Sequence, residues 1–168
     1  RRAMEGRPFS FLCPGIAAPY KGIDVVVPAI ARVRDASFHV RACGNNDDWP
    51  EGLAKARAEA RASGVASRIT FEPEVAFADI GSAYAEADAL LYPTLCESFG
   101  FTLLEALAAG LPVVASDIPV NREIAGNAAL YYDARSPTAL AAAMDRIMAD
   151  AALREELTEK AGRRTTEV

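Results

Sequence analysis

The chain has 168 residues, of which 51% are hydrophobic and 24% are charged, proportions that fit a globular domain with a real core and exclude a disordered chain. Its net charge of −5 at pH 7 argues against a large nucleic-acid-binding surface, which would need a basic stripe. No apolar run approaches the ~20 residues that span a bilayer, and no apolar segment of a secretory signal follows the basic start.

Strand and helix patterns alternate along the whole chain. Short apolar runs that stop at Pro or Gly indicate strands, which we predict at 9–15, 37–44, 68–73, 88–93, 111–116 and 127–133. Helical spacing and helix-forming residues predict helices at 23–34, 53–64, 75–87, 101–110, 120–126, 136–150 and 151–164. Pro28 should kink or shorten the first helix, and Ser136 with Pro137 should begin the sixth.

This alternation predicts an α/β fold with a doubly wound parallel sheet of about six strands, Rossmann-like, with helices on both sides. The strands read as continuous apolar runs, so we expect them to be buried on both faces. The expected strand order is 3-2-1-4-5-6, in one undivided domain over residues 1–168. In that order the loops 14–22 and 93–101 face one crevice at the switch point, where ligands bind. Because the chain begins at Arg1 and opens directly on a strand, we expect it to be a fragment of a longer protein.

Four residues of these two loops and the helix that follows suggest a site for a phosphorylated sugar. Gly100 precedes a helix whose first N–H groups, together with the helix dipole, form an anion site. Lys21 in the opposite loop adds a positive charge. Glu97 and Glu105 can accept hydrogen bonds from sugar hydroxyls. Each acid taken singly is more often a solvated or capping residue, and it is their joint placement that favours a site.

Other reactive side chains are interpreted as structural. Three cysteines without a CxxC pair indicate free thiols in a reducing compartment and small buried hydrophobes, namely Cys13, Cys43 and Cys96. His39 has no partner at a ligand spacing, and Asp47 and Asp48 lack a full metal coordination set. We therefore expect no metal site. Neither GxGxxG nor a P-loop follows the first strand, where Gly15 and Gly22 are seven positions apart.

The segment "PTLCESFGFTLLEALAAGLPVVASDIPVNREIAGNAALYYD", residues 93–133, closely resembles the donor-binding half of retaining GT-B glycosyltransferases of the group 1 family. Two glutamates separated by seven residues, Glu97 and Glu105, are the signature of that family. "PGIAAPYKGID" and "ITFEPEV" with "IGSAYAEADALLYP" resemble its other segments, so the resemblance covers nearly the whole chain. It implies a C-terminal nucleotide-sugar-binding domain whose N-terminal acceptor-binding domain lies outside these residues.

The resemblance also implies roles for single residues. They are Glu97 and Lys21 as catalytic residues, and Gly15, Val75, Gly100, Phe101, Thr102 and Glu105 as donor-binding residues. Glu97 would contact the hydroxyls of the donor sugar, and Glu105 those of the ribose. Lys21 and backbone N–H groups at the start of the helix would hold the diphosphate, and the segment around Val75 would lie against the base. No cofactor is implied beyond the nucleoside diphosphate sugar, which is the donor substrate.

The implied reaction moves a hexosyl unit to an acceptor sugar or lipid-linked glycan bound by the missing domain. The implied location is cytoplasmic, with peripheral membrane attachment of the full-length protein as an open alternative. The segment "SDIPVNREIAGNAALYYD" looks like mannosyltransferase members, which favours GDP-mannose. The fragment alone should bind a nucleotide weakly and transfer nothing.

One position departs from the family pattern. Family members usually carry an arginine after the first glycine, where this chain has Ile16, and losing such a donor costs roughly 3 kcal/mol of transition-state stabilisation. Arg122 is a candidate substitute. This departure keeps a non-catalytic nucleotide-sugar-binding module open as an alternative function. A sugar-nucleotide epimerase is a second alternative, because it uses a related two-domain fold.

Overall fold

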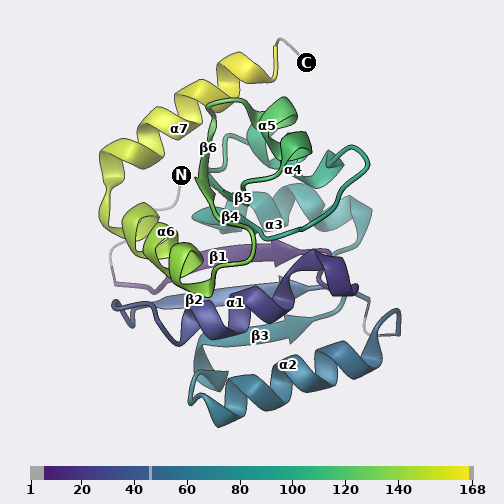
Figure 1. Ribbon diagram of the computed structural model, residues 1–168. Helices are drawn as coiled ribbons and strands as arrows, with labels where there is room; N and C mark the ends of the chain where they lie inside the picture. The colour runs from purple at the N-terminus through teal and green to yellow at the C-terminus, as the bar shows by residue number, and fades with distance from the viewer. Residues whose placement is uncertain (1–5, 46, 167–168) are drawn as a thin grey trace.

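The structure is a computed structural model that describes residues 6–45 and 47–166. It contains a single six-stranded sheet. Its strands are β1 (Phe9–Pro14), β2 (Phe38–Cys43), β3 (Ile69–Glu72), β4 (Ala89–Tyr92), β5 (Val113–Ser116) and β6 (Ala129–Tyr132). All neighbouring strands pair in parallel, in the order β3-β2-β1-β4-β5-β6 (Figure 1). The predicted class and strand order are confirmed.

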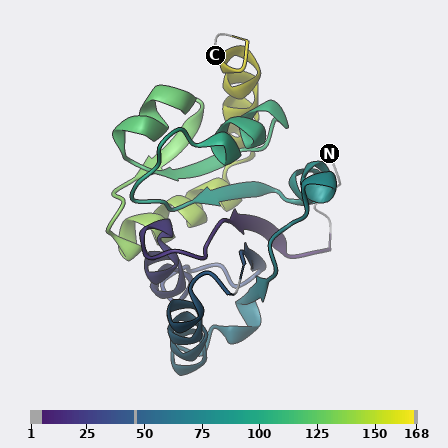
Figure 2. The same ribbon diagram turned by 90° about the vertical axis from the view of Figure 1, so that its right-hand side faces the viewer.

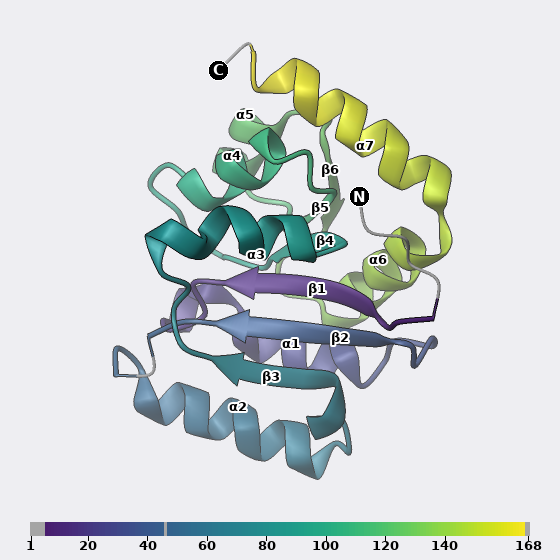
Figure 3. The ribbon, with the colours of Figure 1, turned by 180° about the vertical axis from the view of Figure 1, so that it is seen from behind.

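Helices cover the sheet on two sides (Figures 1 and 3). They are α1 (Ile23–Ile30), α2 (Pro50–Ala62), α3 (Ile80–Glu86), α4 (Phe101–Ala108), α5 (Pro119–Ala125), α6 (Pro137–Ala149) and α7 (Ala151–Arg164). Helix α1 packs against α2 and α6 on one side, whereas α4 packs against α5 on the other, and α7 contacts both α6 and α4. As predicted, Ser136 caps α6 by accepting a hydrogen bond from the Ala139 N–H at 3.1 Å.

Each face of the sheet has its own apolar core. Successive side chains of a strand point to opposite faces, so Phe11 and Leu91 join the core beneath α1, α2 and α6. Their neighbours Leu12 and Leu90 join the core beneath α3, α4 and α5. The central strands are therefore held from both sides, which fixes the positions at which their carboxyl ends present loops.

Three helices differ from their predicted bounds by three residues or more at one end. Helix α1 continues through Pro28 and ends at Ile30, four residues before its predicted end, so it is shorter than the apolar pattern alone suggests. Helix α2 begins at Pro50, inside the predicted loop, since proline is pre-organised for the first helical position. The predicted helix over 75–87 is α-helical only from Ile80, after a 3-10 turn, η3 (Phe77–Asp79).

The prediction that all strands are buried on both faces is wrong for β2 and β3. One face of this strand pair is polar, with His39 Nε2 lying 3.2 Å from Thr70 Oγ1 and Arg41 paired with Glu72 at 3.0 Å. Burial raises the pKa of Glu72, but hydrogen bonds from Arg41 and Thr70 outweigh burial and hold that pKa below its usual range. Figure 3 shows no helix in front of β2 and β3 on this side, because α3 returns toward β1 and β4.

Gly22 fixes how closely the first loop approaches the fourth strand. Its φ is +76°, in the left-handed region, and a Cβ at this position would lie well inside van der Waals contact with the Pro93 carbonyl oxygen. A side chain at position 22 would therefore carry two independent energetic costs, one from a disfavoured backbone conformation and one from a collision with the backbone of Pro93.

We expect Gly22→Ala to lower the free energy of unfolding by more than Gly64→Ala does. Gly64 has nearly the same φ, +71°, but nothing lies within 4 Å of its hypothetical Cβ, so Gly64→Ala measures the conformational cost alone, about 1–2 kcal/mol. Urea unfolding of both variants makes the comparison. Equal destabilisation by the two changes would mean that the backbone at Gly22 has room to yield.

Candidate functional site

The loops after β1 and β4 meet at the carboxyl edge of the sheet, and Figure 2 shows the purple β1 beside the teal β4, both running in the same direction. The Leu95 N–H donates to the Tyr20 carbonyl oxygen at 2.7 Å, and Lys21 Nζ forms an ion pair with Glu97 Oε1. The two loops that the strand order predicted to share a crevice are thus bonded directly to each other, across the switch point between β1 and β4.

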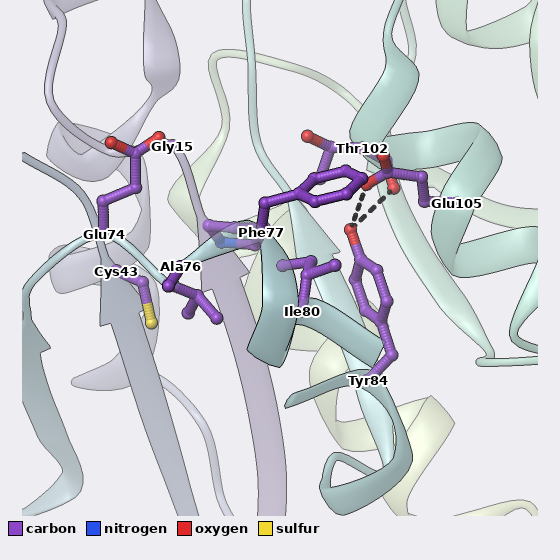
Figure 4. Close-up of a pocket in the computed structure, with 11 residues that line it drawn as sticks. Gly15, Cys43, Glu74, Ala76, Phe77, Ile80, Tyr84, Thr102 and Glu105 are labelled. Carbon is purple, nitrogen blue, oxygen red and sulfur yellow. Dashed lines mark hydrogen bonds between the residues drawn. The ribbon is translucent and has the colours of Figure 1, made fainter. Parts of the chain in front are cut away.

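Two adjoining cavities open at this edge. The larger, about 400 Å³, has Gly15, Val75, Thr102 and Glu105 among its lining residues (Figure 4). The smaller, about 200 Å³, is lined in part by Lys21. Gly15 and Glu74 line both cavities, so the two form one continuous crevice. Five of the sequence-predicted residues line these cavities, and Glu97 is joined to the smaller one by its ion pair with Lys21, whereas Gly100 and Phe101 line neither.

Glu105 is oriented by a tyrosine that no motif in the sequence marks as part of the site. The Tyr84 hydroxyl donates to Glu105 Oε2 at 3.0 Å (Figure 4). Burial, and then the Glu105 carboxylate, raise the pKa of Tyr84, so the phenol stays protonated and remains a donor. The signal was available, since a buried tyrosine hydroxyl needs a hydrogen-bond partner. One Glu105 oxygen is thus held by protein while the other can accept hydrogen bonds from a ligand.

Glu97 lies between a cation and a second tyrosine. The side chains of Lys21 and Glu97 are only 24% and 11% exposed, so solvent screens their attraction less than at an open surface. Burial, and then Glu97, raise the pKa of the Tyr92 hydroxyl. The Glu97 side chain therefore lies beside the Lys21 ammonium and a Tyr92 phenol that stays protonated, in the loop that follows β4.

A buried polar network fixes the loop that carries Glu97. Thr94 Oγ1 donates to the Cys96 carbonyl oxygen at 2.8 Å, and Ser116 Oγ donates to the Thr94 carbonyl oxygen. Asn121 Nδ2 in turn donates to the Ser116 carbonyl oxygen at 3.0 Å. Three side chains, from the loop after β4, from β5 and from α5, thereby hold the backbone that leads to Glu97. The sequence contains these residues without any spacing that marks them as a network.

The helix start that was predicted as an anion site has the expected backbone. Gly100 has φ +84° and is the residue before α4. A Cβ there would lie 3.0 Å from Ile124 Cδ1 and 3.4 Å from the Tyr92 hydroxyl oxygen, so only glycine fits comfortably. The first N–H groups of α4, on Phe101 and Thr102, have no partner within the helix and lie at its positive end.

The position expected to hold an arginine does not face the crevice. Ile16 is 1% exposed and belongs to the core beneath α1, whereas the neighbouring Ala17 and Ala18 line the smaller cavity. Arg122, the candidate substitute, is held elsewhere by Asp117 at 2.7 Å and by stacking 3.8 Å above the Tyr131 ring. Lys21 is thus the cation that the described loops bring to the crevice.

The reactive side chains interpreted as structural have mixed outcomes. Cys13 and Cys43 are buried free thiols as predicted, but Cys96 is exposed, because the loop after β4 turns it outward. Asp48 accepts a hydrogen bond from Asn45 Nδ2 at 2.9 Å. Within residues 6–45 and 47–166, no three His, Cys, Asp or Glu side chains gather as a metal site, and no helix there is long and apolar enough to cross a membrane.

Comparison with known proteins gives the family. The family model described as "Glycosyl transferases group 1" matches residues 8–150. The chain belongs to this family. It is 32% identical over 123 residues to the O-antigen chain mannosyltransferase RfbU of Salmonella typhimurium, covering 73% of this chain and 34% of that protein. It is also 32% identical over 165 residues to a D-inositol 3-phosphate glycosyltransferase of Salinispora tropica, covering 89% of this chain and 33% of the relative.

Solved structures share the fold. A glycosyltransferase from Rickettsia africae superposes with a TM-score of 0.87 at 20% identity, over 97% of this chain and 44% of that one. Anabaena Alr3699/HepE, solved in complex with UDP and glucose, superposes with a TM-score of 0.85 at 19% identity, over 96% of this chain and 44% of its own. This group 1 glycosyltransferase chain spans about a third of the length of the curated relatives it matches.

Proposed function

We propose that this chain binds a nucleoside diphosphate sugar and forms the donor-binding part of a retaining glycosyltransferase, which transfers a hexosyl unit to an acceptor hydroxyl. The observation that carries the proposal is the order of groups along one crevice. Glu105 with its tyrosine lies in the larger cavity, the start of α4 follows, and the Lys21–Glu97 pair adjoins the smaller cavity. A nucleoside diphosphate sugar presents ribose, diphosphate and sugar in that same order.

We assign a protein group to each part of the donor. Glu105 accepts hydrogen bonds from the ribose hydroxyls, because a carboxylate is an acceptor-only group with two oxygens. Backbone N–H groups of Phe101 and Thr102 and the ammonium of Lys21 bind the diphosphate. Glu97 accepts hydrogen bonds from the sugar hydroxyls, and Gly15 leaves room between the two cavities. The nucleobase lies along the segment that contains Val75.

In the proposed reaction the bond between the anomeric carbon and the diphosphate oxygen breaks, the acceptor oxygen bonds to that carbon, and the proton of the acceptor hydroxyl passes to the departing diphosphate oxygen. Negative charge develops on the departing diphosphate, where Lys21 and the start of α4 stabilise it. These groups supply the charge for which other enzymes use a metal ion, so the proposal includes no cofactor. The acceptor, a sugar or lipid-linked glycan, binds to protein outside these 168 residues.

Several findings support the proposal. The chain matches only about a third of its relatives, which leaves room in the whole protein for an acceptor-binding domain. One relative is named a mannosyltransferase, and one structural neighbour contains UDP and glucose. A cytoplasmic location is part of the proposal, and the free thiols of Cys13, Cys43 and Cys96 fit a reducing compartment.

Titration calorimetry of this chain with UDP, GDP and ADP tests the donor site. We expect weak binding of at least one nucleotide, reduced about fivefold in Lys21→Met, since one charge-assisted contact is worth on the order of 1 kcal/mol in a partly solvated site. Lys160→Met is the matched control, because Lys160 pairs with Glu156 on the outer helix α7 and should leave affinity unchanged. Binding of none of the three nucleotides would refute the assignment of the site.

A further inference from the structure

Phe77 is an apolar ring held almost entirely in water at the mouth of the larger cavity. Its exposed fraction is 89%, the highest among the large hydrophobic side chains of the described residues. Phe99 and Phe101 are also exposed, but their rings contact each other, with centroids 4.6 Å apart. No ring or cation contact is recorded for Phe77 in the part of the chain that the structure describes, so its faces are available to a ligand.

The position of Phe77 places this exposed ring in the candidate site. The ring is on the turn η3 that leads into α3, and it lines the cavity that contains Glu105. In Figure 4 the ring extends toward Thr102 and Glu105, with Ile80 beside it. One wall of this cavity is therefore apolar and aromatic, while the opposite wall carries the carboxylate proposed to hold a ribose.

In a nucleotide the base and the diphosphate are attached to different carbons of the ribose, which limits where the base can lie. The diphosphate leaves the ribose toward Gly15 and the smaller cavity, where Lys21 supplies positive charge. The base leaves the ribose at another carbon and takes the remaining part of the larger cavity. That part is bounded by Val75, Phe77 and Ile80, which offer apolar surface rather than charge.

We propose that Phe77 is a positioning residue that stacks on the nucleobase of the donor, an inference that rests on the proposed function. Every nucleobase has a π-face, so this contact adds affinity for any base rather than choosing among bases. Stacking removes the exposed ring and the base from water together. The contact also directs the ribose hydroxyls toward Glu105.

The test compares ligands with and without a base on the same variants. Phe77→Ala should bind GDP and UDP at least about fivefold more weakly than the unchanged chain, the lower limit for loss of one base–aromatic stack. Pyrophosphate, which has no base, should bind both proteins equally. Phe77→Trp should retain the affinity for nucleotides. Phe99→Ala, which removes another exposed ring, is the matched control and should leave nucleotide affinity unchanged.

The outcomes separate this inference from the proposed function. Nucleotide binding that is unchanged in Phe77→Ala, or reduced equally in Phe99→Ala, overturns the stacking role while leaving the donor site in place. Equal losses for pyrophosphate and GDP in Phe77→Ala also overturn it, because the loss would not depend on the base. An unchanged chain that binds none of these ligands overturns both proposals. Thermal unfolding by circular dichroism confirms that each variant is folded.

Discussion

Replacing Glu105 with alanine should weaken the binding of a ribonucleoside diphosphate about 10- to 150-fold, the equivalent of hydrogen bonds to a charged group worth 1.5–3 kcal/mol. The change removes the carboxylate that the Tyr84 hydroxyl orients in the larger cavity. The loss should depend on the ribose. The unchanged chain should prefer GDP to 2′-deoxy-GDP, and Glu105→Ala should bind the two with nearly equal affinity, as measured by calorimetry.

Tyr84→Phe is the matched control for Glu105→Ala. It keeps the carboxylate and removes only the donor that orients it, so it should weaken GDP binding less and retain the preference for the ribose hydroxyl. Because the Tyr84 hydroxyl is buried with a raised pKa, these effects should not vary between pH 6 and pH 8. If Glu105→Ala keeps the full preference for GDP over the deoxy form, Glu105 does not contact the ribose.

Replacing Glu97 with glutamine should have opposite effects on the nucleotide and on the reaction. Lys21 is paired with Glu97 in the free chain, so a diphosphate must compete with a carboxylate for the same ammonium. Glutamine keeps the shape and removes the competing charge, and GDP or UDP should bind more tightly. Hexosyl transfer by the full-length enzyme should fall about 100-fold, the loss typical of a substrate held slightly out of place.

Lys21→Met with Glu97→Gln completes a double-mutant cycle for this pair. Once Lys21 is replaced, the gain in GDP affinity from Glu97→Gln should shrink, because the released cation was its main source. Weaker GDP binding by Glu97→Gln alone would contradict the competition and would place Glu97 in contact with the nucleotide itself. Activity is measured in the full-length enzyme, since the present chain spans only about a third of its relatives.

The sheet could be predicted because its signals are local and redundant. Each strand is a short apolar run that ends at a proline, a glycine or a polar loop, and alternation with helices leaves few topologies to choose from. The meeting of the two loops followed from strand order alone, and the bond from the Leu95 N–H to the Tyr20 carbonyl oxygen bears it out. Gly100 before α4 was readable for the same reason, since a helix start has its own sequence pattern.

What sequence reasoning missed depends on which side chains face one another. The strand "FHVRAC" alternates apolar and polar residues, which is a sign of a half-exposed strand. Because the strand is short, this alternation is a weak signal, and the strand was predicted to be buried on both faces. Ile16 has no local signal that distinguishes the core from the crevice. The Lys21–Glu97 and Tyr84–Glu105 contacts join residues 76 and 21 positions apart, a separation at which spacing carries no information.

The tie between the first and fourth loops has a consequence for the entropy of binding. Gly22 lies against Pro93, and Leu95 is hydrogen-bonded to Tyr20, so both segments that would hold the diphosphate and the sugar are anchored before any ligand arrives. A ligand there gains its contacts without the loss of chain freedom that ordering a loose loop would require. Affinity at this end of the crevice should therefore follow the charges present and depend little on loop flexibility.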